Sequence, residues 1–89
     1  MMESVRIKVT GRVQHVGFRY FTAVEAGKLE IKGFVKNESD GSVLIEAEGE
    51  EDNIELFNHA IKHGPSWSRV DKFLVQSIPV VNYTRFSVK

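Results

Sequence analysis

The dipeptide Asp40-Gly41 separates two short runs of residues that favour extended backbone. An Asp-Gly pair supplies the local hydrogen bonding and the positive φ of a tight turn between antiparallel strands. The run before it, residues 31–37, contains aromatic and β-branched residues, which favour strands. The run after it, residues 42–48, alternates with a period of two. Together they predict a β-hairpin near the middle of the chain, and therefore a fold built on a sheet.

The residues before the hairpin predict a strand followed by a helix. Residues 5–10 alternate apolar and polar side chains, which indicates a half-buried strand that ends at Gly11. Residues 20–29 favour a helix that ends between Lys28 and Glu30. The side chains expected on its buried face are Phe18, Phe21, Val24 and Leu29.

The residues after the hairpin predict a second helix and two strands. Three carboxylates at residues 50–52 complement the dipole at the start of a helix, and Gly64-Pro65 signals its end. The side chains expected to face the core are Ile54, Leu56, Phe57, Ala60 and Ile61. Residues 67–78 form an extended run with imperfect alternation, which a bulge or burial on both faces would explain. Residues 84–88 alternate as a short closing strand.

The order of these elements is β-α-β-β-α-β, with a short strand at the end. This order predicts an α+β fold of the ferredoxin-like class, a sandwich of one mostly antiparallel sheet with two helices on one face and a short fifth strand. A chain of 89 residues supports one hydrophobic core, so we expect a single domain over residues 1–89. Many unrelated functions share this topology, so the function must be argued from particular residues.

Composition argues against several classes of protein. Lys and Arg number 12, as do Asp and Glu, so the formal net charge is zero and the basic excess of a nucleic-acid-binding protein is missing. The absence of Cys excludes disulfides and thiolate metal sites. No apolar run has the length of a membrane span or a signal peptide. We expect a cytoplasmic monomer with no nucleic-acid or membrane partner.

Residues 14–19 connect the first predicted strand to the first predicted helix. Successive backbone N–H groups in such a turn can converge on one point, and the start of the helix adds free N–H groups and its dipole. Arg19 can lean over the same point with a guanidinium that fits two oxygens of a phosphate. This arrangement predicts an anion site, most naturally for a phosphoryl group. The alternative is structural: Gly11 and Gly17 serve the turn, and Arg19 is an exposed residue at a helix start.

Asn37 is the second polar residue of interest, because it ends a predicted strand just before the hairpin turn. A structural interpretation makes it a turn residue whose side chain bonds its own backbone. A functional interpretation needs Asn37 beside the anion site, which the fold allows if its strand neighbours the end of the first strand. A carboxamide both donates and accepts hydrogen bonds, so it can hold and orient a water molecule.

Three blocks of the sequence resemble the acylphosphatase family. GRVQHVGFR at residues 11–19 resembles the signature G-x-V-Q-G-V-x-F-R. GFVKNESDGSV at residues 33–43 resembles the second block, G-x-V-x-N-x-x-D-G-x-V. Gly64-Pro65 and the triplet at residues 68–70 resemble a later block. The similarity covers nearly the whole chain in one register, so residues 1–89 are identified as an acylphosphatase-like domain.

This resemblance implies hydrolysis of the carboxyl-phosphate bond of small acyl phosphates, which gives a carboxylate and inorganic phosphate. It implies no metal, no other cofactor and no covalent intermediate. Arg19 matches the phosphate-binding arginine of the family, and Asn37 matches the residue that positions the attacking water. The residues that match the phosphate-binding loop are Gln14, His15, Val16, Gly17 and Phe18.

Two residues depart from the family pattern. His15 stands where the signature has glycine, and an imidazole there either crowds the phosphate or, when protonated, adds positive charge beside it. We expect His15 to weaken the hydrolytic activity or to make it depend on pH. The alternative is a non-catalytic domain that still binds phosphate or another anion but in which His15 has impaired hydrolysis. Glu30 stands where the resemblance suggests glycine, and we expect it to favour a different helix cap at some cost in stability.

Other interpretations rest on weaker patterns. An RNA-recognition module shares the element order, but it needs aromatic side chains on its central strands, and residues 43–48 have none. His59 and His63 have the spacing of a helical metal-binding pair, although two surface histidines near a helix C-terminus are the simpler interpretation. Trp67 and Phe73 are expected in the core. The acidic residues from Glu46 to Asp52 are expected to form a solvated surface.

Overall fold

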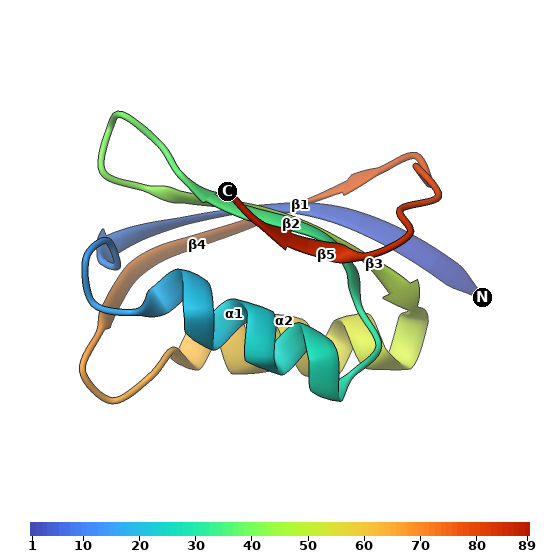
Figure 1. Cartoon of the computed structure of the whole chain (residues 1–89), viewed down its shortest axis with the longest axis horizontal. Coiled ribbons are helices and arrows are strands. Elements are labelled where there is room, and N and C mark those ends of the chain that lie inside the picture. The colour runs from blue at the N-terminus through green and yellow to red at the C-terminus, as the bar shows by residue number, and fades with distance from the viewer.

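The computed structural model describes all 89 residues. Its elements, in chain order, are β1 (Met2–Arg12), α1 (Phe18–Lys28), β2 (Lys32–Asn37), β3 (Val43–Glu50), α2 (Glu51–His63), β4 (Arg69–Ile78) and β5 (Phe86–Val88). The five strands form one sheet in the order β4-β1-β3-β2-β5. β5 runs parallel to β2, and the other neighbours are antiparallel. Both helices cover one face of the sheet, as Figure 1 shows, which confirms the ferredoxin-like fold.

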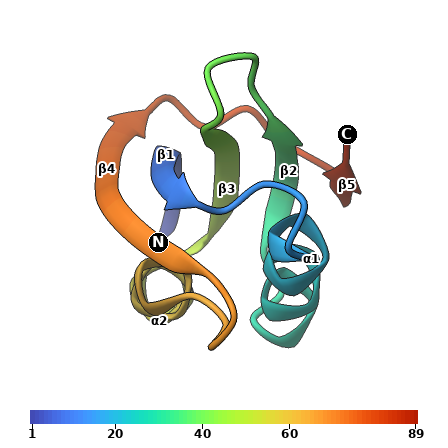
Figure 2. The ribbon, with the colours of Figure 1, turned by 90° about the vertical axis from the view of Figure 1, so that its left-hand side faces the viewer.

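The core lies between the sheet and the two helices. The alternating side chains predicted for the two central strands point into it: Val5, Ile7 and Val9 from β1, and Val43, Ile45 and Ala47 from β3, are all buried. The helices contribute Phe18, Ala26, Ile54, Phe57 and Ile61. Viewed along the sheet in Figure 2, α1 lies against β2 and α2 lies on the β4 side. Neither helix has the length and apolar character needed to cross a membrane.

Of the two causes considered for the imperfect alternation of β4, the structure shows the bulge; burial on both faces is wrong, because Leu74 and Val75 are exposed. Thr10 pairs with Lys72 and Gly11 pairs with Val70, so Asp71 is an extra residue that shifts the register. This bulge changes the parity of the strand, so that Val70 and Phe73 both pack against the core although they are three positions apart in the sequence.

Three expectations about apolar side chains are wrong. Leu56 on α2 is 57% exposed and Val24 on α1 is 37% exposed, so neither belongs to the buried face of its helix. Thr22 takes a buried position on α1, because its hydroxyl donates a hydrogen bond to the backbone oxygen of Phe18, four residues earlier. Trp67, expected in the core, is 61% exposed, whereas Phe73 does pack against the core.

The expectation of a solvated acidic surface is wrong for Glu46 and Glu48. Both lie on the face of β3 opposite the helices, and both are buried. The segment 79–85, which connects β4 to β5 at the opposite edge of the sheet, covers them. The Glu48 carboxylate accepts hydrogen bonds from the Ser4 hydroxyl and from three successive backbone N–H groups, those of residues 81–83.

Glu46 is bound to the same connecting segment. Its carboxylate accepts a hydrogen bond from the Tyr83 hydroxyl and forms an ion pair with Arg6 at 2.8 Å. Burial and the bond to Glu46 raise the pKa of Tyr83 to about 12. These buried carboxylates therefore fix the course of the chain into β5.

Candidate active site

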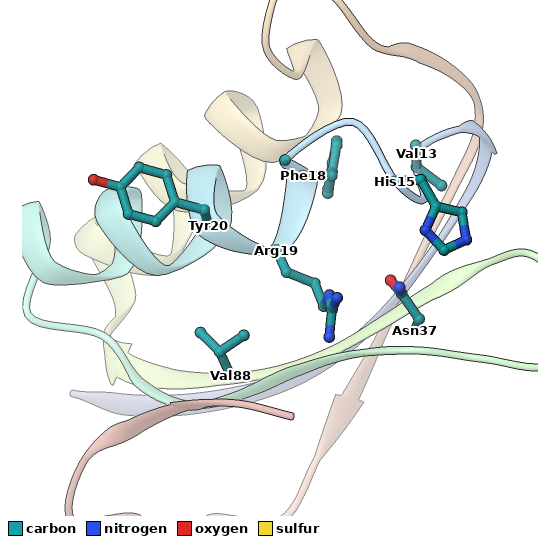
Figure 3. A pocket seen from close by; sticks show the side chains of 8 residues that line it. Val13, His15, Phe18, Arg19, Tyr20, Asn37 and Val88 are labelled. Atoms are coloured by element: carbon teal, nitrogen blue, oxygen red, sulfur yellow. The ribbon is translucent and has the colours of Figure 1, made fainter.

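One cavity of about 270 Å³ is lined by candidate residues of both sequence blocks, although Gln14 and Val16 of the first block do not line it. Its lining comes from the β1–α1 connection, the first turn of α1, the end of β2 and the end of β5, as Figure 3 shows. The lining residues are Val13, His15, Gly17, Phe18, Arg19, Tyr20, Asn37 and Val88. Arg19 and Asn37, which the sequence placed 18 positions apart, thus face the same space.

The route by which Asn37 reaches the cavity differs from the one expected. Its strand does not neighbour β1, because β3 lies between them in the sheet. Instead, α1 packs across β2 and β5, and this packing brings the first turn of the helix to the end of β2. The juxtaposition of Arg19 and Asn37 therefore depends on helix packing and not on strand pairing.

The β1–α1 connection has the backbone conformation predicted for an anion-binding turn. His15 and Gly17 both have left-handed backbone, with φ of 62° and 80°. The first amide of this region with a partner in the chain is that of Phe21, which donates to the backbone oxygen of Gly17 at 3.0 Å. The backbone N–H groups of residues 15–20 donate no hydrogen bond within the chain. Unpartnered N–H groups at a helix start form a concave site that favours an anion.

The side chain of Gln14 has a structural role in this connection. Its amide nitrogen donates to the backbone oxygens of Glu38 at 2.8 Å and Ser42 at 2.7 Å. These bonds attach the connection to the β2–β3 hairpin, and therefore to the strand that carries Asn37. On the other side, the indole nitrogen of Trp67 donates to the backbone oxygen of Val16. Neither contact could be predicted from the sequence, because both join residues distant in the chain.

Arg19 extends from the first turn of α1 into the cavity (Figure 3). Its Nη1 donates a hydrogen bond to the backbone oxygen of Lys89 at 2.7 Å. Lys89 in turn donates its backbone N–H to the oxygen of Val35 in β2 at 2.9 Å. The guanidinium is thus held at one nitrogen, and its other N–H groups remain free for a ligand. Lys89 has no sequence signal that marks it as part of a site.

Asn37 is half-buried, and its side-chain oxygen is buried without any hydrogen-bond partner. The structural interpretation, in which this oxygen bonds its own turn, is therefore wrong. Asp40 has that role instead, since its carboxylate accepts hydrogen bonds from the backbone N–H and the hydroxyl of Ser42. A buried acceptor without a partner is unfavourable unless a ligand or water satisfies it.

The family model of acylphosphatases matches residues 5–88, which is almost the whole chain. The chain belongs to the acylphosphatase family. It is 43% identical over 90 residues to the acylphosphatase of Oceanobacillus iheyensis, with 99% of each chain covered. Among solved structures, it matches the acylphosphatase of Bacillus subtilis with a TM-score of 0.94 and 43% identity, covering 100% of this chain and 99% of that one. It matches an acylphosphatase from Coxiella burnetii with the same TM-score and 33% identity, covering 99% and 93%.

His15 is the residue by which this acylphosphatase departs from the family signature. The left-handed backbone at this position, with φ of 62°, explains the glycine of the signature, because a side chain there is strained. The side chain is exposed and lines the cavity, and Figure 3 shows the ring beside Asn37. His15 therefore adds an imidazole ring to the rim of the anion site, while its backbone N–H donates no hydrogen bond within the chain.

The remaining candidates lie elsewhere on this acylphosphatase. His59 and His63 are exposed on α2 and line a shallow groove between the helices, with Glu25 on its far side. The structure has no group of three or more metal-ligating side chains placed to hold an ion. On the open face of β3, where an RNA-recognition module presents aromatic rings, Glu46 and Glu48 lie buried under residues 79–85.

Proposed function

We propose that this acylphosphatase hydrolyses small acyl phosphates with Arg19, the backbone of residues 15–18 and Asn37 as its working groups. Membership of the family supplies the reaction, the cleavage of a carboxyl-phosphate bond into a carboxylate and inorganic phosphate. The roles of individual residues are our proposal. One observation supports them most: Arg19, residues with unpartnered backbone N–H groups, and Asn37, whose side-chain oxygen has no partner, all line one cavity.

In this mechanism the phosphoryl group lies against the N–H groups of residues 15–18, with Arg19 bonded to its oxygens. These donors stabilise the charge on the equatorial oxygens in the transition state. Because Arg19 and the N–H groups supply the positive charge, we propose that the reaction needs no metal. Asn37 accepts a hydrogen bond from a water molecule and orients its oxygen toward phosphorus.

The chemical step exchanges one phosphorus–oxygen bond for another. The water oxygen forms a bond to phosphorus as the bond from phosphorus to the carboxyl oxygen breaks, and the electron pair of that bond leaves with the carboxylate. A carboxylate is a stable leaving group, so no strong general acid is required. Asn37 is not a base at neutral pH, so the proton of the water passes to a phosphoryl oxygen or to solvent.

The test is an assay of acyl phosphate hydrolysis with a chelator present, comparing the wild type with Arg19→Ala. We expect turnover by the wild type and a loss of about a thousandfold in kcat/KM in the variant. Arg69→Ala is the matched control, because Arg69 pairs only with Asp71 on the exposed surface of β4. Its kcat/KM should stay within about twofold of wild type, since a surface ion pair contributes little.

Asn37→Ala separates binding from chemistry. If Asn37 orients water, kcat falls by about a hundredfold while the dissociation constant of inorganic phosphate stays nearly constant. Absence of turnover by the wild type, together with phosphate binding that is lost in Arg19→Ala, would favour the alternative of an anion-binding domain silenced by His15. In that case His15→Gly should restore turnover.

A further inference from the structure

A second cavity, of about 150 Å³, lies on the other face of β5 from the candidate active site. It is lined by Gly33 and Phe34 of β2, by residues 83–85, and by Ser87 and Lys89, and the two cavities have no lining residue in common. Side chains alternate between the faces of a strand, so β5 separates the two cavities. Figure 2 shows β5 at the edge of the sheet, beside β2.

Positive charge without a partner gathers around this second cavity. Arg85 and Lys89 line it, and neither takes part in any ion pair of the structure. The Lys89 ammonium lies 4.3 Å from the centre of the Phe34 ring, a contact that leaves its charge uncompensated. The ammonium of Lys36 lies 6.0 Å from the same ring and pairs with Glu38 only at 3.8 Å.

No Asp or Glu lines the cavity to offset these cations. The carboxylate bonded to a lining residue is that of Glu46, which accepts a hydrogen bond from the Tyr83 hydroxyl. Arg6 already pairs with this carboxylate at 2.8 Å. The charge of Glu46 is therefore balanced within the protein, and the cavity keeps its positive potential for an anion.

The donors of the cavity match a phosphate ion. Arg85, Ser87 and Lys89 occupy alternate positions of an extended chain, so the two long side chains reach toward each other over the Ser87 hydroxyl. The hydroxyls of Ser87 and Thr84 have no hydrogen-bond partner in the chain, whereas that of Tyr83 does. A guanidinium fork, an ammonium and two hydroxyls are donors for the four oxygens of phosphate.

We propose that this cavity is a second phosphate site, which binds inorganic phosphate between Arg85 and Lys89. Inorganic phosphate is a product of acyl phosphate hydrolysis, so the ligand forms at the protein itself. The site also adjoins the residue that holds Arg19, because the backbone oxygen of Lys89 accepts a hydrogen bond from that guanidinium. The exposed cations give the second site a lower affinity for phosphate than the active site has.

The experiment is a titration of the isotope-labelled protein with inorganic phosphate at constant ionic strength, followed by the amide resonances in NMR spectra. We expect two binding curves. The amides of residues 15–18 report the active site, and those of Gly33 and Ser87 report the second site at higher phosphate concentration. In Arg85→Ala the dissociation constant of the second curve should rise about tenfold, while the first curve stays within about twofold.

Lys62→Ala is the matched control, because Lys62 is an exposed cation of α2 without an ion pair and does not line either cavity. It should leave both curves unchanged. If Gly33 and Ser87 do not respond to phosphate, or respond equally to acetate, the second phosphate site is wrong while the proposed function stands. If residues 15–18 alone fail to respond, the proposed function loses its phosphate site and the second site stands.

Discussion

The guanidinium of Arg19 is hydrogen-bonded to the backbone oxygen of Lys89, 70 residues further along the chain. Lys89 is itself bonded through its N–H to Val35 of β2. Asn37 ends the same strand. β2 therefore positions both side chains to which we give the main roles in hydrolysis. It carries Asn37 directly, and it positions Arg19 through Lys89.

Deletion of Lys89 should impair the site by removing the bond that orients Arg19. We expect kcat/KM for an acyl phosphate to fall about tenfold and inorganic phosphate to inhibit more weakly, because small errors in the position of a catalytic group have large costs. Lys89→Ala is the control, since it keeps the backbone oxygen and should retain activity. An equal loss in both variants would show that the side chain of Lys89 matters and the backbone bond does not.

Trp67→Phe should weaken phosphate binding by removing the donor to the Val16 oxygen. We expect the dissociation constant of inorganic phosphate, measured by calorimetry, to rise about fivefold, the value of one hydrogen bond. The fold should be unaffected because Trp67 is 61% exposed. Trp67 is also the single tryptophan of the chain, so its fluorescence in the wild type should change when phosphate binds. An unchanged affinity would mean that the connection keeps its shape without this contact.

His15→Gly should strengthen binding of the acyl phosphate. The imidazole of His15 lines the cavity in which the phosphoryl group is proposed to bind, and its backbone is left-handed with φ of 62°. Glycine removes both the ring that crowds the phosphate and the backbone strain. We therefore expect a lower KM for the acyl phosphate in the glycine variant. Identical KM values in the two proteins would refute a functional role of His15.

Glu30→Gly should stabilise the protein without changing its activity. Glu30 follows the last turn of α1 with a left-handed φ of 55°, so the expectation that it favours a different cap is wrong: it adopts the strained conformation of the family glycine. We expect the free energy of unfolding to rise by about 1 kcal/mol. Glu30→Ala should give no such gain, because alanine is also strained there. Denaturant unfolding measures both.

Glu48→Gln should destabilise the protein at neutral pH. Burial alone raises the pKa of the Glu48 carboxyl, but hydrogen bonds from the Val81 N–H, the Ser4 hydroxyl and two further backbone N–H groups outweigh it, so its pKa lies below the ordinary 4.5. A lowered pKa in the folded state gives stability that is present above the unfolded-state pKa and lost as the pH falls through the folded-state value. We expect the variant to lose about 2 kcal/mol at neutral pH.

The same variant should lose less stability than the wild type when the pH falls below about 4.5. Glu55→Gln is the control, because Glu55 is exposed on α2 and its side chain makes no hydrogen bond. Its free energy of unfolding should stay within about 0.5 kcal/mol of wild type. Unfolding curves at several pH values distinguish the two carboxylates.

Much of the fold could be predicted from the sequence because its signals are local. The Asp40-Gly41 turn and the alternation around it predict the central hairpin. The imperfect alternation of residues 67–78 left a bulge as one of two explanations, and the register of β4 shows that bulge. The residues of the signature also lie within one turn of backbone, so the anion-binding connection is a local structure. The exposed positions of Val24 and Leu56 were not predictable, because helical spacing does not say how wide the buried face is.

The sequence by itself determined the order of the elements, the left-handed turn at Gly17 and the residue types that make an anion site. Only the tertiary structure decided which distant groups meet there. Packing of α1 on β2 and β5 places Arg19 beside Asn37 and gives it Lys89 as a partner, and the connection from β4 buries Glu46 and Glu48. The physical reason is that periodicity and turn chemistry act over a few residues, whereas these contacts arise when elements remote in sequence pack around one core.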